Sequence, residues 1–357
     1  MGIAMQRLSL GATFSTTYFE SFHVARVFAT LDLMTEGRAA WNIVTSMNDG
    51  EALNMGHTAH SEHDRRYDRA DEFMEVVMGH RDAWDDGAIV ADRTTGLFAH
   101  PEKSIAWTTK ASSSSRVARS PSHGSDSGWS KRPRPAFRRA LGRGRLNVLP
   151  PPAPGPTRLC VIQGPGPAAG RDPEKVLVCA GMYPVVAETR AEAEGHAAFI
   201  DTLPKEIDGI SLLSEVLNFD FSKQPIDAPL SQEAIDSWTG MQGMRDRMRR
   251  ELGGRLPTPR DFINISRRGT LHDHPRFVGS PKDAADGMEE WFSTRACDGF
   301  VVGASHVPGV YEDFSCLVVP ELQGRGLFHT DYVGTTLREN LGLERPPVGV
   351  WHSVQTS

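Results

Sequence analysis

Residues 8–46, LSLGATFSTTYFESFHVARVFATLDLMTEGRAAWNIVTS, contain the strand–helix–strand pattern that decides the fold. Residues 8–16 are β-prone and end in hydroxyl side chains, which predicts a buried strand that finishes in a polar loop. Ser21 is placed to cap the following helix, and Gly37 stands where a C-terminal glycine stop belongs. The apolar residues of that helix follow the spacing i, i+3, i+4, i+7: Val24, Val27, Phe28 and Leu31. Residues 40–46 predict a second short strand, again ending in hydroxyls.

The same alternation continues along the chain wherever a pattern is readable. Residues 47–63 are polar and predict a loop, and a long helix should follow from about Asp64. Its apolar face should contain Ala70, Phe73, Met74 and Val77. Further on, the sequence predicts strands at 176–181, 183–186 and 298–303, and helices at 190–203, 281–292 and around 314–322. In the 281–292 helix the inward residues should be Ala285, Met288, Trp291 and Phe292. Alternating strands and helices predict an α/β fold with parallel strands.

Composition limits the class of protein. The chain has 357 residues, of which 39% are hydrophobic and 24% charged, enough for a sizeable core. It has no run of about 18 apolar residues, which argues against a transmembrane helix, and its first residues lack the pattern of a signal peptide. Four widely spaced cysteines suit a reducing cytosol. The formal charge of −6 argues against nucleic acid as a partner. We expect a cytoplasmic protein.

Residues 107–168 differ from the rest of the chain. They hold eleven Lys and Arg and one acidic residue, Asp126, so their formal charge is +10; they also hold ten of the 24 prolines. No sustained amphipathic period and no capped helix are visible there. Basic clusters such as Lys131–Arg134 lack the interleaved aromatic residues of a nucleic-acid site, apart from Phe137.

Several consecutive motifs resemble one family. They are ARVFATLD (25–32), GRAAWNIVTS (37–46), HDRRYDRADEF (63–73), VGSP (278–281), DGF (298–300), VPELQGRGL (319–327) and GTTLRE (334–339). Together they are similar to the bacterial-luciferase-like flavin monooxygenases, in the branch of nitrilotriacetate monooxygenase component A. The resemblance covers about 5–106 and 169–346. Several motifs in the right order are far more specific than a single short pattern.

The resemblance implies a TIM-type (β/α)8 barrel with its active site at the carboxyl ends of the strands. It implies reduced FMN, supplied by a separate flavin reductase, which is used with O2 to oxygenate a small organic substrate. It also implies a homo-oligomer. We expect an incomplete barrel, because the family pattern places two further β/α units before the first strand. The FMN-phosphate turn that the family carries within the central segment is also missing.

We therefore divide the chain into 1–106 and 169–346, the two parts of the barrel, an aberrant segment 107–168 and a tail 347–357. Our hypothesis for 107–168 is a shifted reading frame, because the family pattern stops and returns abruptly. The alternative is a true disordered, basic insertion. Translating the same nucleotides in the other two frames tests this: the hypothesis fails if no family-like strand and glycine turn emerge.

Two predicted strand ends carry candidate flavin-binding residues. Thr13 ends the first strand, and the resemblance implies that its hydroxyl contacts the flavin ring. Asn42 lies within the second, apolar strand, where an unpaired buried amide costs about 1–3 kcal/mol, so it needs a partner such as the flavin pyrimidine edge. Thr45 is a similar candidate. For all three the alternative is pairing within the protein.

The start of the helix near residue 64 supplies three further candidates. His63 and Tyr67 lie one helical turn apart and match flavin contacts of the family. Arg66 adds a cation near a helix N-terminus, where a phosphate or ring oxygen is favoured, unless it pairs with Asp64 or Glu62. His57, His60 and His63 do not form a helical metal-binding pattern, so we predict no metal site. No residue is assigned as catalytic.

Three functional hypotheses remain open. The first is an active FMN-dependent monooxygenase, and the second is a non-catalytic remnant of that family. The third is a binding module that acts through its basic segment 107–168. Reduced-flavin binding favours the first, protease sensitivity or aggregation the second, and salt-sensitive retention on heparin the third.

Overall fold

The computed structural model describes residues 2, 4–84, 87–103, 144–147, 177–267, 270–272 and 274–345. They divide into two compact units, each with parallel strands. The first unit contains Met1–Ser46, Ser61–Gly142 and Tyr332–Ser357, and the second contains Met47–His60 and Arg143–Asp331. Apart from residues 144–147, the aberrant segment 107–168 lies outside the described residues, as does the tail 347–357.

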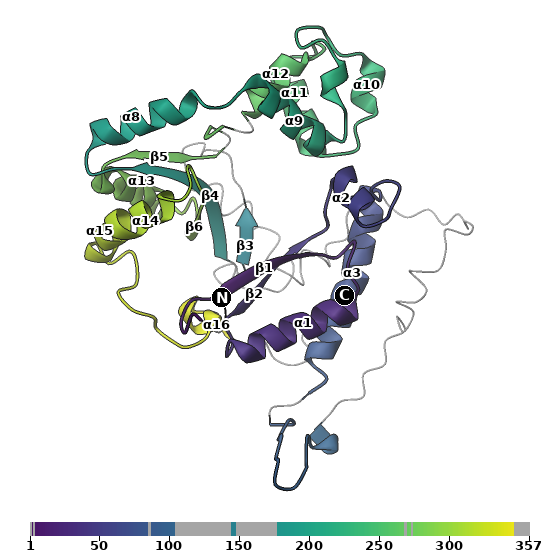
Figure 1. Cartoon of the computed structure of the whole chain (residues 1–357), viewed down its shortest axis with the longest axis vertical. Helices are drawn as coiled ribbons and strands as arrows, with labels where there is room; N and C mark the ends of the chain where they lie inside the picture. The colour runs from purple at the N-terminus through teal and green to yellow at the C-terminus, as the bar shows by residue number, and fades with distance from the viewer. Residues whose placement is uncertain are drawn as a thin grey trace. The chain divides into compact units, whose positions relative to one another are not determined.

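The first unit is built on the strand–helix–strand pattern. β1 (Leu10–Ser15) pairs in parallel with β2 (Ala39–Val44), and α1 (Ser21–Met34) connects them. The register places Thr13 opposite Asn42. α3 (His63–Arg81) packs beside α1 (Figure 1). A short turn, η1 (Pro101–Lys103), ends the described part of this region. The parallel pairing brings the hydroxyl-rich ends of both strands to one edge.

An aromatic core joins these strands and helices. Phe28 stacks on Trp41 with ring centroids 5.1 Å apart, and Phe14 meets Phe28 edge-on at 5.5 Å. The buried aliphatic and aromatic residues of the same core are Val24, Ala25, Ala70, Phe73, Met74 and Val77. The predicted apolar face of α3 is therefore confirmed, since all four of its residues are buried.

A buried arginine fixes the N-terminal segment onto this unit. Arg38 is 6% exposed. Its guanidinium donates to the carbonyls of Thr35 at 2.8 Å, Met5 at 2.7 Å, Leu8 at 2.8 Å and Gly2 at 3.4 Å. Carbonyl oxygens thus solvate the cation in place of water, which offsets part of the cost of burying it.

The C-terminal segment of the first unit is attached at Gly37. Thr336 and Glu339 form a capping box at the start of α16 (Leu337–Asn340), and the Leu337 amide donates to the Gly37 carbonyl at 3.0 Å. Gly37 has φ +84°, and a Cβ there would lie 2.8 Å from Thr336 Cγ2. Glycine is needed at this position both for its backbone conformation and for the close approach of the chain.

The second unit is organised around one long strand. β4 (Leu177–Val186) pairs in parallel with β3 (Gly144–Asn147), β5 (Arg276–Gly279) and β6 (Gly299–Val302). Its helices are α8 (Arg190–Asp201), α13 (Pro281–Ser293), α14 (Val310–Asp313), the π-helical turn η4 (Phe314–Val318) and α15 (Val319–Gly324). The core between β4 and α13 contains Met182, Val186, Phe277, Ala284, Ala285 and Met288.

A helical region of the second unit has a core of its own. It contains α9 (Glu206–Leu217), η3 (Phe221–Lys223), α10 (Gln232–Asp236), α11 (Gln242–Glu251) and α12 (Pro259–Ser266). Phe221, Trp238 and Phe262 pack together with centroids 5.0–5.8 Å apart. α2 (Asp49–Asn54) attaches here, because the Asn218 side chain accepts from Asp49 N at 2.9 Å and donates to Met47 O at 3.0 Å.

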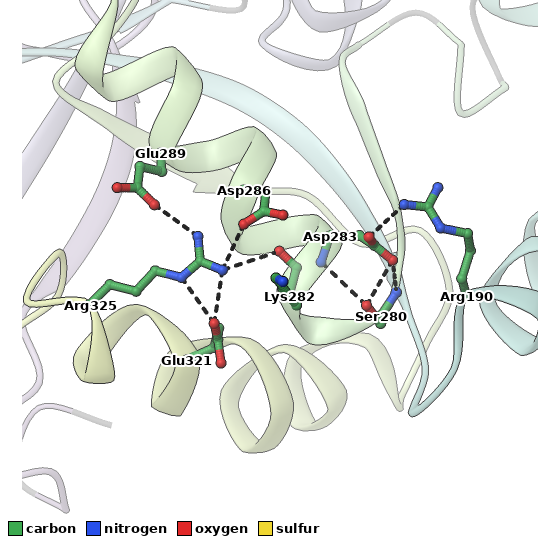
Figure 2. Close-up of polar contacts among 8 residues, drawn as sticks. All are labelled: Arg190, Ser280, Lys282, Asp283, Asp286, Glu289, Glu321 and Arg325. Carbon is green, nitrogen blue, oxygen red and sulfur yellow. Dashed lines mark hydrogen bonds and ion pairs between the residues drawn. The ribbon is translucent and has the colours of Figure 1, made fainter.

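Charged side chains tie α13 to its neighbours in the second unit. Figure 2 shows the Arg325 guanidinium enclosed by three carboxylates: Asp286 at 2.7 Å, Glu289 at 2.8 Å and Glu321 at 2.8 Å. At the start of α13, Ser280 and Asp283 form a capping box, and Arg190 pairs with Asp283 at 2.5 Å. The hydroxyl and the amide of Ser280 both donate to the Asp283 carboxylate, and these bonds hold the pKa of this carboxyl below its usual value.

The structure corrects several local predictions. Glu20, not Ser21, precedes α1, and Ser21 is its buried first residue. The predicted loop 47–63 contains α2, whose six residues are too few to show a helical period. The two strands predicted at 176–186 are one strand, β4. Phe292 is 51% exposed rather than inward, because α13 turns its Ala284–Ala285–Met288 face to the sheet.

The α/β class with parallel strands is confirmed. The described strands form a two-stranded sheet and a four-stranded sheet. A closed barrel of eight strands is therefore not seen among the described residues. No helix in the described part of the chain is long and apolar enough to cross a membrane.

Replacing Arg38 with Met should destabilise the first unit by about 3 kcal/mol, because several carbonyls would lose their donor at a buried site. Hydrogen exchange of the β1 amides measures this as faster opening. Arg93→Met, at an exposed arginine, is the matched control and should change nothing. Equal exchange in both variants would contradict the role given to Arg38.

Candidate functional site at the ends of β1 and β2

The first unit brings two of the predicted residues into direct contact. Asn42 Nδ2 donates to Thr13 Oγ1 at 3.1 Å across the strand pair. Both side chains are exposed, so the premise that Asn42 is a buried amide is wrong, although its expected need for a partner is met. A hydroxyl and an amide side by side offer both donors and acceptors to a ligand.

Hydroxyl groups cluster where the two strands end. Ser15, Thr16 and Thr17 are buried, at 3%, 0% and 8% exposure. Ser46 Oγ donates to Ser15 Oγ at 2.7 Å, and Thr17 Oγ1 donates to the Thr45 carbonyl at 2.7 Å. The chain reverses at Ser46, which has φ 56°, a conformation that non-glycine residues seldom adopt. Such strained backbone often occurs at ligand sites.

Arg66 carries the positive charge of this edge. It comes from the first turn of α3 and is 7% exposed. Its Nη1 donates to the carbonyls of Ser46 and Thr45, the latter at 3.5 Å. Among the described residues no carboxylate pairs with it, and its buried Nε has no hydrogen-bond partner. Burial lowers the pKa of Arg66, yet an arginine stays charged at neutral pH.

A second arginine, one turn further along α3, makes similar contacts. Arg69 Nε donates to the Thr16 carbonyl at 3.0 Å, and Nη2 donates to the Phe19 carbonyl at 3.3 Å. Together Arg66 and Arg69 attach the start of α3 to the ends of both strands. We did not predict Arg69, but its spacing of three from Arg66 places both on one helix face, and this spacing was the available signal.

His63 and Tyr67 lie on the same face of α3, as predicted. Their ring centroids are 4.7 Å apart, and His63 Nδ1 contacts Asp64 Oδ1 at 2.9 Å. The side chain of His63 is 51% exposed. The side chain of Glu62, the residue before α3, does not cap the first amides of the helix, so this helix end favours an anionic or oxygen-rich group.

The arrangement therefore forms three pairs: Thr13 with Asn42, Arg66 with Thr45, and His63 with Tyr67. All of them belong to the first unit. Ser15 and Ser46 join them from the strand ends and were not predicted as site residues, although the hydroxyl endings of both strands were visible. Within the described ranges, no group of three His, Cys, Asp or Glu side chains could hold a metal ion.

A polar, cationic cluster at the carboxyl ends of parallel strands is typical of barrel-type α/β enzymes. Residues 3–104 match the family described as luciferase-like monooxygenase. The dibenzothiophene-sulfone monooxygenase of Rhodococcus erythropolis is 34% identical over 366 residues, covering 97% of this chain and 78% of the relative. The nitrilotriacetate monooxygenase component A of Aminobacter aminovorans is 33% identical with the same coverage.

Solved structures agree with these matches. DmoA from Hyphomicrobium sulfonivorans has a TM-score of 0.73 at 26% identity, covering 99% of this chain and 76% of that one. A riboflavin lyase with modified FMN has a TM-score of 0.74 at 23% identity, covering 100% and 81%, and supports the fold alone. The chain belongs to the luciferase-like monooxygenase family, whose members use reduced flavin. The similar identities do not assign it to the nitrilotriacetate branch.

Replacing Arg66 with Met should loosen the start of α3, because the Ser46 and Thr45 carbonyls lose their donor. We expect the amides of residues 66–70 to exchange about tenfold faster, which corresponds to roughly 1.4 kcal/mol. Arg65→Met is the control, since Arg65 is exposed on the same turn. Unchanged exchange in the Arg66 variant would show that this buried guanidinium does not hold the helix.

Proposed function

We propose that this chain is the oxygenase component of a two-component monooxygenase that uses reduced FMN and O2 on a small organic substrate. A separate flavin reductase supplies the reduced FMN. The family membership supports flavin-dependent oxygenation, and the relative from Aminobacter is named component A, which implies a second component. The observation that carries the proposal for this chain is the buried Arg66 guanidinium, whose Nε has no partner among the described residues.

Arg66 fits a flavin nucleotide for a physical reason. An unpaired, buried donor costs about 1–3 kcal/mol, and a charged one more. A ligand oxygen, from a phosphate or a flavin ring, would satisfy Nε and gain a charge-assisted hydrogen bond. The backbone amides at the start of α3 add further hydrogen-bond donors, whose partial positive charge also favours an oxygen-rich ligand. The site thus favours a ligand rich in acceptor oxygens.

The remaining predicted residues complement such a ligand. Thr13 and Asn42 present a hydroxyl and an amide that match the alternating donors and acceptors of the flavin ring edge. His63 and Tyr67, near the start of α3, each present one aromatic ring with a polar group. Thr45 offers its hydroxyl beside the Arg66 contact. When bound, the flavin supplies the O2 chemistry, and these side chains orient it.

The substrate proposal follows from the relatives. Their names include a dibenzothiophene sulfone, an N-acetyl-S-(2-succino)cysteine and nitrilotriacetate, in which sulfur or nitrogen adjoins carbon. We infer a small organic molecule with a C–S or C–N bond.

Anaerobic titration with reduced FMN tests the flavin assignment. The wild-type chain should bind with a dissociation constant in the micromolar range. Arg66→Met should weaken binding about tenfold to a hundredfold, the loss of one charge-assisted hydrogen bond. Arg65→Met, beside it but exposed, should bind like wild type.

The absence of flavin binding by the wild-type chain would refute the proposal. Flavin binding without product is a different outcome. With a flavin reductase, NADH and O2, dibenzothiophene sulfone and nitrilotriacetate are suitable probes, and mass spectrometry should detect an oxygenated product. A chain that binds reduced FMN but oxygenates none of a broad substrate panel would be a non-catalytic member of the family.

A further inference from the structure

A tightly held loop follows β6 in the second unit. The Gly303 amide donates to the Met182 carbonyl at 2.8 Å, which continues the pairing of β6 with β4 beyond the strand. A Cβ at Gly303 would lie 2.7 Å from the Tyr183 ring, so this position needs glycine. The loop therefore leaves the carboxyl end of a parallel strand in one defined path, and that end is where enzymes of this fold place their reacting groups.

Ser305 in this loop fixes the orientation of its neighbour. Ser305 Oγ donates to the Pro184 carbonyl on β4 at 2.6 Å. It also lies 3.1 Å from Nδ1 of His306. A hydroxyl has one proton, and Pro184 receives it, so Ser305 can only accept from the imidazole. Nδ1 of His306 must then carry a proton, which leaves Nε2 with a free lone pair in the neutral ring.

Asp313 lies beside that lone pair. Its Oδ2 is 3.6 Å from His306 Nε2, too long for a hydrogen bond but close enough for charge attraction. The backbone of Asp313 is fixed in α14, because its amide donates to the Gly309 carbonyl at 2.9 Å. A proton arriving at Nε2 would therefore create an imidazolium within 4 Å of a negative charge.

We propose that His306 is a proton acceptor, set in its tautomer by Ser305 and stabilised in its charged form by Asp313. The claim that the proton comes from the monooxygenase substrate rests on the proposed function. The claim that Nε2 of His306 is free to accept a proton does not. In the step, an acidic O–H, N–H or C–H bond of the substrate breaks, its electron pair stays on the substrate atom, and the proton binds Nε2. The His306 side chain is 36% exposed, so water can remove the proton afterwards.

Other titratable groups surround this loop. Tyr311 and Glu312 precede Asp313 on α14, and Tyr183 faces the loop from β4. His274 lies against Tyr183 with ring centroids 5.1 Å apart. Of the described carboxylates, Asp313 is the one within 4 Å of a His306 ring nitrogen. Replacing Asp313 therefore tests whether this carboxylate stabilises the protonated imidazole of His306.

Nitrogen-15 NMR of the full-length chain, labelled at histidine, reads the tautomer directly and without substrate. The resonance missing in His306→Gln identifies the residue. We expect the Nδ1–H form in the wild type and a mixture of tautomers in Ser305→Ala, while His196→Gln, at an exposed histidine, leaves the signal unchanged. An Nε2–H form in the wild type would overturn the proposal, as would an unchanged tautomer in Ser305→Ala.

A second experiment measures turnover. With reduced FMN, O2 and nitrilotriacetate, whose protonated amine carries an acidic N–H, His306→Gln should lower product formation at fixed pH about a hundredfold. Asp313→Asn should lower it about threefold, as expected for one partly exposed charge pair. Unaltered turnover in His306→Gln would overturn the proposal. If the wild type binds flavin but oxygenates none of the broad substrate panel, the proposed function fails and the tautomer alone decides the inference.

Discussion

The contact between the Arg66 guanidinium and the backbone carbonyls of Ser46 and Thr45 is the constraint on which the candidate site depends. It places a buried cation at the carboxyl end of β2, and no carboxylate in the described part of the chain pairs with it. Burying a charge in this way is costly, and carbonyl oxygens compensate for only part of that cost. A ligand oxygen would complete the compensation. The same contact fixes the start of α3, and with it His63 and Tyr67.

Much of this arrangement could be predicted from sequence, because it depends on local patterns. Alternating β-prone and helical periods located β1, α1, β2 and α3, and the hydroxyl endings of the strands marked the edge that carries the site. The register that pairs Thr13 with Asn42 could not be predicted, since it depends on how far each strand extends. Arg66 was predicted as a binding residue, but its carbonyl partners are set by the reversal of the chain at Ser46.

Other features depend on tertiary packing and had no clear local signal. α2 has six residues and is held by Asn218, which is distant in sequence. Phe292 follows the helical period of α13 but lies on its exposed side, because small residues of the opposite face approach the sheet. The roles of Ser305, His306 and Asp313 arise from a hydrogen bond to Pro184, 121 residues earlier in the chain. Short sequence motifs were enough to predict the family, whereas these long-range contacts are visible only in the structure.

The central claim is that the strand ends of the first unit bind the flavin. Hydrogen exchange of the full chain, measured anaerobically with and without reduced FMN, tests it most directly. The account predicts slower exchange at residues 13–17, 42–46 and 63–69, with no comparable change in α8 of the second unit. Flavin binding that protects other residues and leaves these three stretches unchanged would contradict it.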